Sequence, residues 1–274
     1  MNLRTTTTLH NGTLMPLIGL GVFQVEDGPE VENSVRWALE LGYRHLDTAS
    51  YYQNEAGVGK ALAESGVDRE DVFLTTKVWN DQQGYQNTLD AFDESRKKLR
   101  TDVVDLYLVH WPIKGLYKDT WKALEKLYAE GKVRAIGVSN FLIHHIEELL
   151  NNTDVVPAVN QVELHPFLRQ KQLHDFCVQK GIQIEAWSPL TRGRFLDNAV
   201  ITDIAAAHGK SPAQVLIRWD LQHHIVTIPK STHRERIKEN SEVFDFELTQ
   251  EEMERLDSLD TETRIGPHPD VMGG

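Results

Sequence analysis

The sequence predicts an α/β fold, a (β/α)8 (TIM) barrel formed by one domain over residues 1–274. Short runs of apolar and β-branched residues recur eight times, and stretches with helical periodicity separate most of them. Alternation of strand and helix indicates a parallel sheet, and eight such units indicate that the sheet closes. The expected strands cover residues 17–20, 43–46, 72–76, 104–109, 133–138, 158–162, 182–186 and 225–228.

The first element should be an N-terminal β-hairpin, because Asn11-Gly12 stands between two short β-prone stretches. The first helix follows from the spacing of Val31, Val35 and Leu39, which places three apolar side chains on one face. Several helices should end at a glycine in the left-handed conformation that a C-terminal cap requires. These glycines are Gly42, Gly131 and Gly181.

Additional helices are expected after strand seven and at the C-terminus. The interval before strand eight holds two helices, over 198–208 and 211–222, and the second begins with Ser211-Pro212, an N-cap followed by proline. A further helix over 247–259 should begin with a capping box between Thr249 and Glu252. No shift in composition marks a second domain.

Composition disfavours several classes of protein. The net charge of −12 is opposite in sign to that of a typical nucleic-acid binder. The single cysteine, Cys177, excludes an internal disulfide and is expected to be buried in a helix. No segment has the length of a membrane span, and residues 1–13 lack the apolar core of a signal peptide. We therefore predict a soluble cytoplasmic monomer that binds neither membranes nor nucleic acids.

Three consecutive strands each end in an ionisable residue. Asp47, Lys77 and His110 follow the second, third and fourth expected strands. Catalytic residues of this fold stand at the C-terminal ends of its strands. One charged residue at a strand end is as often structural as functional, but three adjacent ones with complementary chemistry indicate a site.

Tyr52 lies five residues beyond Asp47 and should fold back over the same rim. A free tyrosine has a pKa of about 10, and a neighbouring Lys77 cation is expected to lower it. Asp47 would keep Lys77 charged, and His110 would polarise a carbonyl. This set predicts general-acid chemistry on a carbonyl group without a metal.

Several segments resemble one known family in the same order along the chain. They are residues 42–49 with Tyr52, Asn54 and Glu55, then 76–79, 108–112, 137–141, 160–161 with Glu163 and His165-Pro166, and 228–231. The sequence is thereby similar to bacterial aldo-keto reductases of the 2,5-diketo-D-gluconate, glyoxal and methylglyoxal reductase type. The resemblance implies NADPH-dependent reduction of small aldehydes, dicarbonyls or keto-sugars to alcohols. The resemblance implies that Tyr52 is the proton donor, that Lys77 and Asp47 adjust the pKa of Tyr52, and that His110 orients the carbonyl.

Carbonyl reduction needs a hydride source, because no side chain can supply a hydride, and the resemblance implies that this source is NADPH. The run Gly57-Val58-Gly59 lacks the third glycine of a dinucleotide motif and follows no strand, so it is interpreted as helix. A segment over 229–236 follows strand eight and opens a helix, where phosphate is favoured. The basic residues here are Lys230, Arg234, Arg236 and Lys238. The alternative is a solvated basic helix.

The resemblance assigns cofactor contacts along this rim. It places Lys230, Ser231 and Arg236 at the 2′-phosphate of NADPH, and Glu239 and Asn240 at the adenine. The carboxamide would bind Ser139, Asn140 and Gln161, Trp187 would stack on the nicotinamide, and Ser188 and Leu190 would border the pyrophosphate. The loop over 191–197 is short, which predicts comparatively free cofactor exchange.

Three aromatic residues, Phe23, Trp79 and Trp111, fall in strand-end loops and should wall the substrate pocket together with His110. The alternative is that they belong to the core. The short tail over 264–269 predicts an open site for small carbonyl compounds. The histidine pairs at 144–145 and 223–224 are interpreted as solvated faces, and no histidine spacing predicts a metal site.

Two other functions fit parts of the pattern. Lysine at a barrel strand end can form a Schiff base, so Lys77 could instead serve a lyase. Some proteins that resemble reductases serve as NADPH-sensing channel subunits. The complete Tyr–Lys–His–Asp set favours the enzyme over both.

Overall fold

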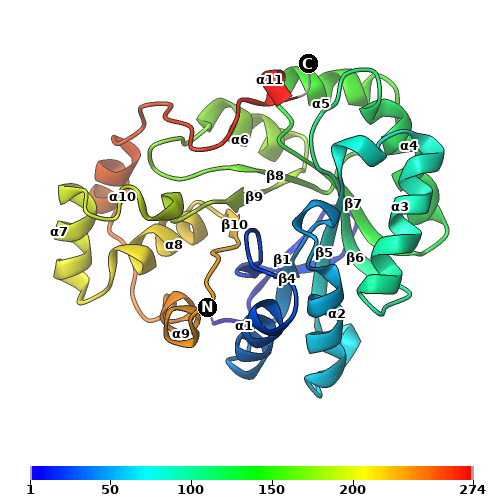
Figure 1. Cartoon of the computed structure of the whole chain (residues 1–274). Helices are drawn as coiled ribbons and strands as arrows, with labels where there is room; N and C mark the ends of the chain where they lie inside the picture. Colours follow the sequence, from blue (N-terminus) through cyan, green and yellow to red (C-terminus); the bar gives the residue numbers. More distant parts are fainter. Residues whose placement is uncertain (1, 273–274) are drawn as a thin grey trace.

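The computed structural model describes residues 2–272 and contains an eight-stranded parallel sheet surrounded by helices (Figure 1). Neighbouring strands follow chain order from β3 to β10, and every pair is parallel. All eight predicted strands are present. Their bounds are Leu20–Gly21 (β3), His45–Asp47 (β4), Phe73–Val78 (β5), Val104–Val109 (β6), Val133–Ser139 (β7), Val159–Glu163 (β8), Gln183–Trp187 (β9) and Val226–Thr227 (β10).

The sheet closes between its first and last strands. The Gly19 amide donates to the Thr227 carbonyl at 2.9 Å, and the Thr227 amide donates to the Leu17 carbonyl at 3.0 Å. Parallel bridges join Ile18 to Thr227 and Gly21 to Lys230. Residues 17–19 therefore act as strand at the closure, although β3 itself begins at Leu20. The predicted barrel is confirmed.

The N-terminal hairpin pairs β1 (Thr6–Thr8) with β2 (Leu14–Pro16) in antiparallel register. Its connection covers residues 9–13, and Gly12 adopts a φ of 87° there. Thr7 bonds to Gln183 at the start of β9, and Asn11 donates to the Arg134 carbonyl near the start of β7. The hairpin thus covers the N-terminal end of the barrel and leaves the opposite end open.

Helices surround the sheet (Figure 1). Within the described residues, two α-helices lie between β9 and β10, and three follow β10. The predicted capping box of Thr249 with Glu252 forms, and Ser211 caps its helix as predicted. Ser211 also forms a capping box with Gln214, which was not predicted. The last long helix begins at 250 rather than 247 because Thr249 is extended and serves as its cap. The helices are Pro29–Glu40 (α1), Glu55–Glu64 (α2), Tyr85–Lys98 (α3), Tyr117–Ala129 (α4), Ile143–Leu150 (α5), Lys171–Gln179 (α6), Ala199–His208 (α7), Pro212–Gln222 (α8), Arg234–Ser241 (α9), Gln250–Asp257 (α10) and Pro269–Met272 (α11).

Glycines act as expected at helix ends and at one helix contact. Gly42, Gly131 and Gly181 have φ values of 101°, 70° and 72°, which confirms the predicted C-terminal caps. Gly59 lies within α2, and a Cβ there would be 2.5 Å from the Lys98 carbonyl oxygen. The interpretation of this glycine-rich run as helix is confirmed, and Gly59 allows α2 to pack closely on α3.

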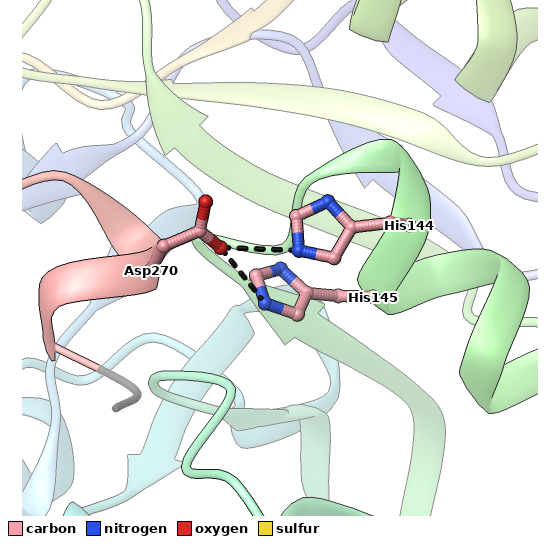
Figure 2. Close-up of side chains that lie close together, drawn as sticks. All are labelled: His144, His145 and Asp270. Atoms are coloured by element: carbon pink, nitrogen blue, oxygen red, sulfur yellow. Dashed lines mark ion pairs between the residues drawn. The ribbon is translucent and has the colours of Figure 1, made fainter.

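The C-terminal segment is fastened to α5 by three side chains (Figure 2). Nε2 of His144 and Nε2 of His145 lie 3.0 and 3.3 Å from Asp270 Oδ1. Nδ1 of His145 accepts the Leu142 amide proton at 3.1 Å, so the neutral ring carries its hydrogen on Nε2 and donates it to Asp270. This tautomer makes the cluster a hydrogen-bonded clasp and leaves His145 without a lone pair for a metal.

The prediction that all four paired histidines are solvated is wrong for two of them. His145 is buried against Asp270, and His223 bonds Asp257 at 2.9 Å. His144 and His224 are exposed as expected, and Cys177 is fully buried in α6. Within residues 2–272, none of the helices has the length and apolarity needed to cross a bilayer.

Candidate active site

The open end of the barrel holds a cavity of about 880 Å³, bordered by most of the predicted site residues. Asp47 ends β4, Lys77 lies in β5, and His110 follows the last residue of β6. Tyr52 belongs to a short 3-10 helix, Ser50–Tyr52 (η1). The structure brings these four residues together, as the strand-end pattern predicts.

Lys77 is completely buried beneath the cavity and does not border it. Its ammonium group donates to Asp47 Oδ1 and Oδ2 at 2.7 and 2.8 Å, and to the Thr48 carbonyl at 2.9 Å. The Tyr52 hydroxyl lies 3.4 Å away. Burial lowers the pKa of Lys77, but the Asp47 carboxylate outweighs burial and holds it above its usual value. Lys77 is therefore a cation at neutral pH.

The pKa of Tyr52 differs from the sequence-based expectation. Burial raises it to about 12, and the lowering effect of Lys77 offsets only part of that increase. The expectation of a net decrease is wrong, because it considered the cation and not the loss of water around the ring. Lys77 still favours the ionised form of Tyr52 relative to a site without it. Its role is to make proton release less costly in a site that otherwise opposes it.

His110 is neutral in this site. Burial and the nearby Lys77 charge place its pKa well below the usual value. Its ring meets Tyr52 and Trp79 edge-on at centroid distances of 5.8 and 5.0 Å. A neutral imidazole has one N–H, which is the group needed to donate a hydrogen bond to a carbonyl oxygen.

Aromatic rings wall the cavity beside the catalytic group. Phe23, Trp79 and Trp111 all border it, and Trp79 stacks on Tyr51 at 3.8 Å between centroids. Phe23 lies 5.0 Å from the Tyr52 ring. The alternative of three core residues is therefore wrong, although Trp111 is nearly buried. Tyr51 also borders the cavity.

The loop that carries Phe23 is held by Asn54. Its side-chain amide donates to the carbonyls of Val22 and Val25, both at 2.9 Å, and its oxygen accepts from Thr48 at 2.8 Å. Asn54 is fully buried. It thereby fixes Phe23 relative to the Asp47–Tyr52 segment.

The basic residues gather at the other end of the cavity. Lys230, Ser231 and Arg236 border it, together with Glu239 and Asn240. Arg234 and Lys238 do not, because they lie near acidic partners outside it: Arg234 within 4.0 Å of Glu40, and Lys238 at 2.8 Å from Glu242. The alternative of a solvated basic helix thus applies to these two residues alone.

The middle of the cavity presents amide and hydroxyl groups. The side chains of Ser139, Asn140 and Gln161 border it, followed by Trp187, Ser188 and Leu190. The Trp187 indole donates to Asn140 Oδ1 at 2.9 Å, which fixes the ring plane. Asn140 in turn donates to the His110 carbonyl at 3.0 Å. Through Asn140, the Trp187 ring, which is expected to stack on a nicotinamide, is linked by hydrogen bonds to the backbone of His110.

Comparison with known proteins identifies the family. The profile described as aldo/keto reductase family matches residues 17–261. The chain belongs to the aldo/keto reductase family. It is 58% identical to glyoxal reductase of Bacillus subtilis (strain 168) over 99% of this chain and 98% of that protein. It is 46% identical to methylglyoxal reductase DkgA of Escherichia coli (strain K12), over 98% of each.

Solved structures agree with this assignment. The apo form of Gox0644 superposes with a TM-score of 0.93 at 46% identity, covering 97% of both chains. A mutant of Gox0644, solved in complex with NADPH, gives a TM-score of 0.92 at 45% identity over 98% of each. The predicted family, barrel and oxidoreductase class are confirmed, and so is the predicted NADPH-dependent carbonyl reduction.

The cavity of this aldo/keto reductase fits such a cofactor chemically. Cationic side chains at one end suit phosphate, whereas the amides in the middle suit a carboxamide close to Tyr52 and His110. The lyase alternative does not fit. Lys77 donates to three oxygens of Asp47 and Thr48 and has no surface on the cavity, so it offers no free amine to a carbonyl substrate.

Some residues that border the cavity were not predicted. Arg192, in the 3-10 segment Thr191–Gly193 (η4), lies with its guanidinium carbon 5.7 Å from the Phe23 ring centre, so it bridges two walls. Pro267 and Met272 of the C-terminal segment also border the cavity, and the predicted open site is therefore partly covered. A charged residue in a strand-end loop was a signal for Arg192. Nothing in the sequence indicated where the tail would lie.

The tail is placed by a buried carboxylate at the end of β8. Glu163 accepts the amide protons of Ile265 and Gly266 at 2.5 and 3.0 Å. A Cβ on Gly266 would be 2.5 Å from the Trp187 ring, so only glycine fits there. Glu163 belonged to the segments that carry the family resemblance, and the structure gives it this anchoring role.

Proposed function

We propose that this aldo/keto reductase reduces small dicarbonyl compounds such as glyoxal and methylglyoxal, and other small aldehydes and ketones including keto-sugars, to alcohols with NADPH. The main support is the contact of 3.4 Å between the Lys77 ammonium and the Tyr52 hydroxyl, at the base of a cavity with aromatic walls. Relatives named glyoxal reductase and methylglyoxal reductase, at 58% and 46% identity, support the choice of substrates.

NADPH supplies the hydride when bound, and the protein supplies orientation and a proton. The N–H of neutral His110 would donate to the substrate carbonyl oxygen and polarise it. Tyr52 would give its hydroxyl proton to that oxygen as negative charge develops there. The Lys77 cation, held by Asp47, would stabilise the tyrosinate until Tyr52 regains a proton from solvent.

The cofactor assignments are part of the same proposal. Lys230, Ser231 and Arg236 would bind the 2′-phosphate, and the mixed basic and hydrogen-bonding character of this end supports that placement. Glu239 and Asn240 would border the adenine. Ser139, Asn140 and Gln161 would bind the carboxamide, Trp187 would stack on the nicotinamide, and Ser188 and Leu190 would border the pyrophosphate.

Three broader predictions remain attached to the proposal: one domain over residues 1–274, a monomer, and a cytoplasmic location. Within the described residues, six large apolar side chains are highly exposed, and this small number favours the monomer. They are Leu14, Tyr51, Tyr85, Leu116, Val178 and Val271. Light scattering after gel filtration measures the mass directly.

A substrate screen tests the proposed activity. Purified protein is mixed with glyoxal, methylglyoxal, a simple aldehyde or a keto-sugar, and the absorbance of NADPH is followed, with NADH in parallel. We expect turnover of the dicarbonyls and a preference for NADPH. Oxidation of NADPH with simple aldehydes would also argue against a purely NADPH-sensing role. A protein that binds NADPH tightly but turns over none of these substrates would contradict the proposal.

A further inference from the structure

A second buried carboxylate lies inside the barrel beside the catalytic pair. Glu185 of β9 is completely buried and stands opposite Gln161 in the register of β8 and β9. One side-chain nitrogen of Gln161 donates to Glu185 Oε2 and to Asp47 Oδ2, both at 2.8 Å. Two acidic residues from β4 and β9, strands that are not neighbours in the sheet, therefore share one amide group.

This sharing fixes the orientation of Gln161. Both hydrogens of its amide are used by the two carboxylates, so the amide cannot turn over without placing its oxygen against acceptors. The remaining polar atom, the carbonyl oxygen, belongs to a side chain that borders the cavity. Gln161 thus presents an acceptor, and the matching ligand group is the N–H side of a carboxamide.

The charges around Glu185 do not balance if both carboxylates are ionised. Lys77 is the cation of this cluster, and it bonds to both oxygens of Asp47. The second oxygen of Glu185, Oε1, has no hydrogen-bond donor and lies 3.5 Å from Nε2 of the neutral His45. A buried ionised carboxylate with an empty oxygen is costly, whereas a protonated Oε1 can point at the His45 nitrogen.

We propose that Glu185 is a positioning residue of the reductase: in its protonated form it holds Gln161 toward the cofactor carboxamide and leaves the charge of Lys77 available to Tyr52. The proposal rests on the roles of Gln161 and Tyr52 given above. It adds a residue that touches neither cofactor nor substrate. Loss of the Glu185 proton would put a second negative charge beside Lys77 and oppose formation of the tyrosinate.

The surroundings of Glu185 support this pattern of protonation. The titratable groups that face it are His45 and Asp47 from β4 and Lys77 from β5, with Tyr52 of η1 also acting on this cluster. Burial, followed by the Asp47 charge, raises the pKa of Glu185 to about 8. Burial also lowers the pKa of His45 to about 3, so His45 stays neutral, and its Nε2 accepts when the ring hydrogen is on Nδ1.

Two variants separate the charge of Glu185 from its hydrogen bond. Glu185→Gln keeps an oxygen that can accept from Gln161 but cannot ionise, and Glu185→Leu removes the acceptor at similar volume. The probes are NADPH binding by fluorescence titration and the pH dependence of kcat/KM with methylglyoxal. Asp220→Asn is the matched control, because Asp220 is a buried acid whose pKa is likewise raised by burial but which accepts from Thr227 and does not border the cavity.

For wild type and Asp220→Asn, we expect kcat/KM to decline above about pH 8. In Glu185→Gln that decline should move upward by at least about one pH unit while the Kd for NADPH stays within about twofold. In Glu185→Leu the Kd should rise about two- to tenfold, the effect of one net hydrogen bond. Coincident pH profiles in wild type and Glu185→Gln would overturn the role of the proton, and unchanged NADPH binding in Glu185→Leu would overturn the positioning of Gln161.

Gln161→Ala separates this inference from the proposed function. If that variant binds NADPH as tightly as wild type, the assignment of Gln161 to the carboxamide fails, whatever the Glu185 variants show. If Gln161→Ala weakens NADPH binding and the Glu185 variants behave as wild type, the positioning role of Glu185 is excluded and the assignment of Gln161 to the carboxamide stands. If Glu185→Leu does not fold, the pH profile of Glu185→Gln still decides the role of the proton.

Discussion

The ammonium group of Lys77 lies 3.4 Å from the Tyr52 hydroxyl while all of its shorter contacts are to Asp47 and Thr48. The Asp47 carboxylate therefore fixes the position of Lys77. Lys77 acts on Tyr52 through its positive charge and not as a nucleophilic amine. Because burial raises the pKa of Tyr52 to about 12, the site depends on this charge to make proton release feasible.

Replacing Tyr52 should remove the proton donor and leave the cavity intact. We expect Tyr52→Phe to lower kcat for methylglyoxal by about 10²- to 10⁴-fold, the usual contribution of general-acid catalysis. The Kd for NADPH should be unchanged. Tyr51→Phe is the matched control, because Tyr51 borders the same cavity but stacks on Trp79. Turnover near the wild-type level in Tyr52→Phe would remove Tyr52 from the mechanism.

Breaking the buried ion pair should reduce stability as well as activity. Lys77→Met leaves the Asp47 carboxylate buried without its cation, and we expect the free energy of unfolding to fall by about 3–5 kcal/mol in urea titrations. The double variant Lys77→Met/Asp47→Asn removes the stranded charge and should regain most of that stability. It should stay inactive. Equal stability of both variants would show that the pair does not act as a buried salt bridge.

Much of this arrangement could be predicted from the sequence because barrel geometry is regular. Once β4, β5 and β6 were recognised, Asp47, Lys77 and His110 had to meet at one rim. Helix caps depend only on residues close in the sequence, so the caps at Gly42 and Thr249 were predicted correctly. The segments shared with the family supplied the cofactor contacts, which no periodicity in the sequence provides.

What the sequence could not predict depends on contacts across the barrel or between distant segments. Glu185 looks like one more residue of a strand until the register of β8 and β9 places it opposite Gln161. Predicting the clasp between His145 and Asp270 would have required knowing where the C-terminal segment runs. The sign of the Tyr52 pKa shift required the degree of burial, and spacing gives no measure of that.

The basic end of the cavity predicts how the enzyme chooses its cofactor. Arg236→Ala should raise the KM for NADPH by about tenfold or more, the loss of one charge-assisted hydrogen bond, and leave the KM for NADH unchanged because NADH lacks the 2′-phosphate. Lys238→Ala is the control, because Lys238 is paired with Glu242 and does not border the cavity. Equal effects of Arg236→Ala on both cofactors would place Arg236 away from the 2′-phosphate.

Arg192 should slow cofactor release. The short loop over 191–197 predicts free exchange, but the contact of Arg192 with Phe23 links the β9 loop to the β3 loop across the cavity. A cation–π contact of about 0.5–2 kcal/mol implies that Arg192→Ala releases NADPH about two- to thirtyfold faster in stopped-flow fluorescence. Arg192→Lys should retain part of the effect. A release rate that does not change in Arg192→Ala would restore the free-exchange prediction.

The clasp at the C-terminus should make stability depend on pH below neutrality. Burial, followed by repulsion from His144, lowers the pKa of His145 from 6.5 to about 4. Between those values the unfolded chain binds a proton at this residue that the folded protein excludes, so stability falls as the pH falls from 6.5 toward 4. Relative to His145→Gln, the free energy of unfolding of wild type should drop by up to about 1.4 kcal/mol per pH unit in that window.

Urea titrations of both proteins at several pH values measure this difference directly. His224→Asn is the control, because His224 is exposed and should follow wild type at every pH. Above about pH 7.5 the difference between wild type and His145→Gln should be constant, since the histidine is then mostly neutral in both the folded and the unfolded chain. If the difference also stays constant down to pH 4, His145 titrates alike in the folded and unfolded chains, and the buried, neutral clasp on Asp270 is contradicted.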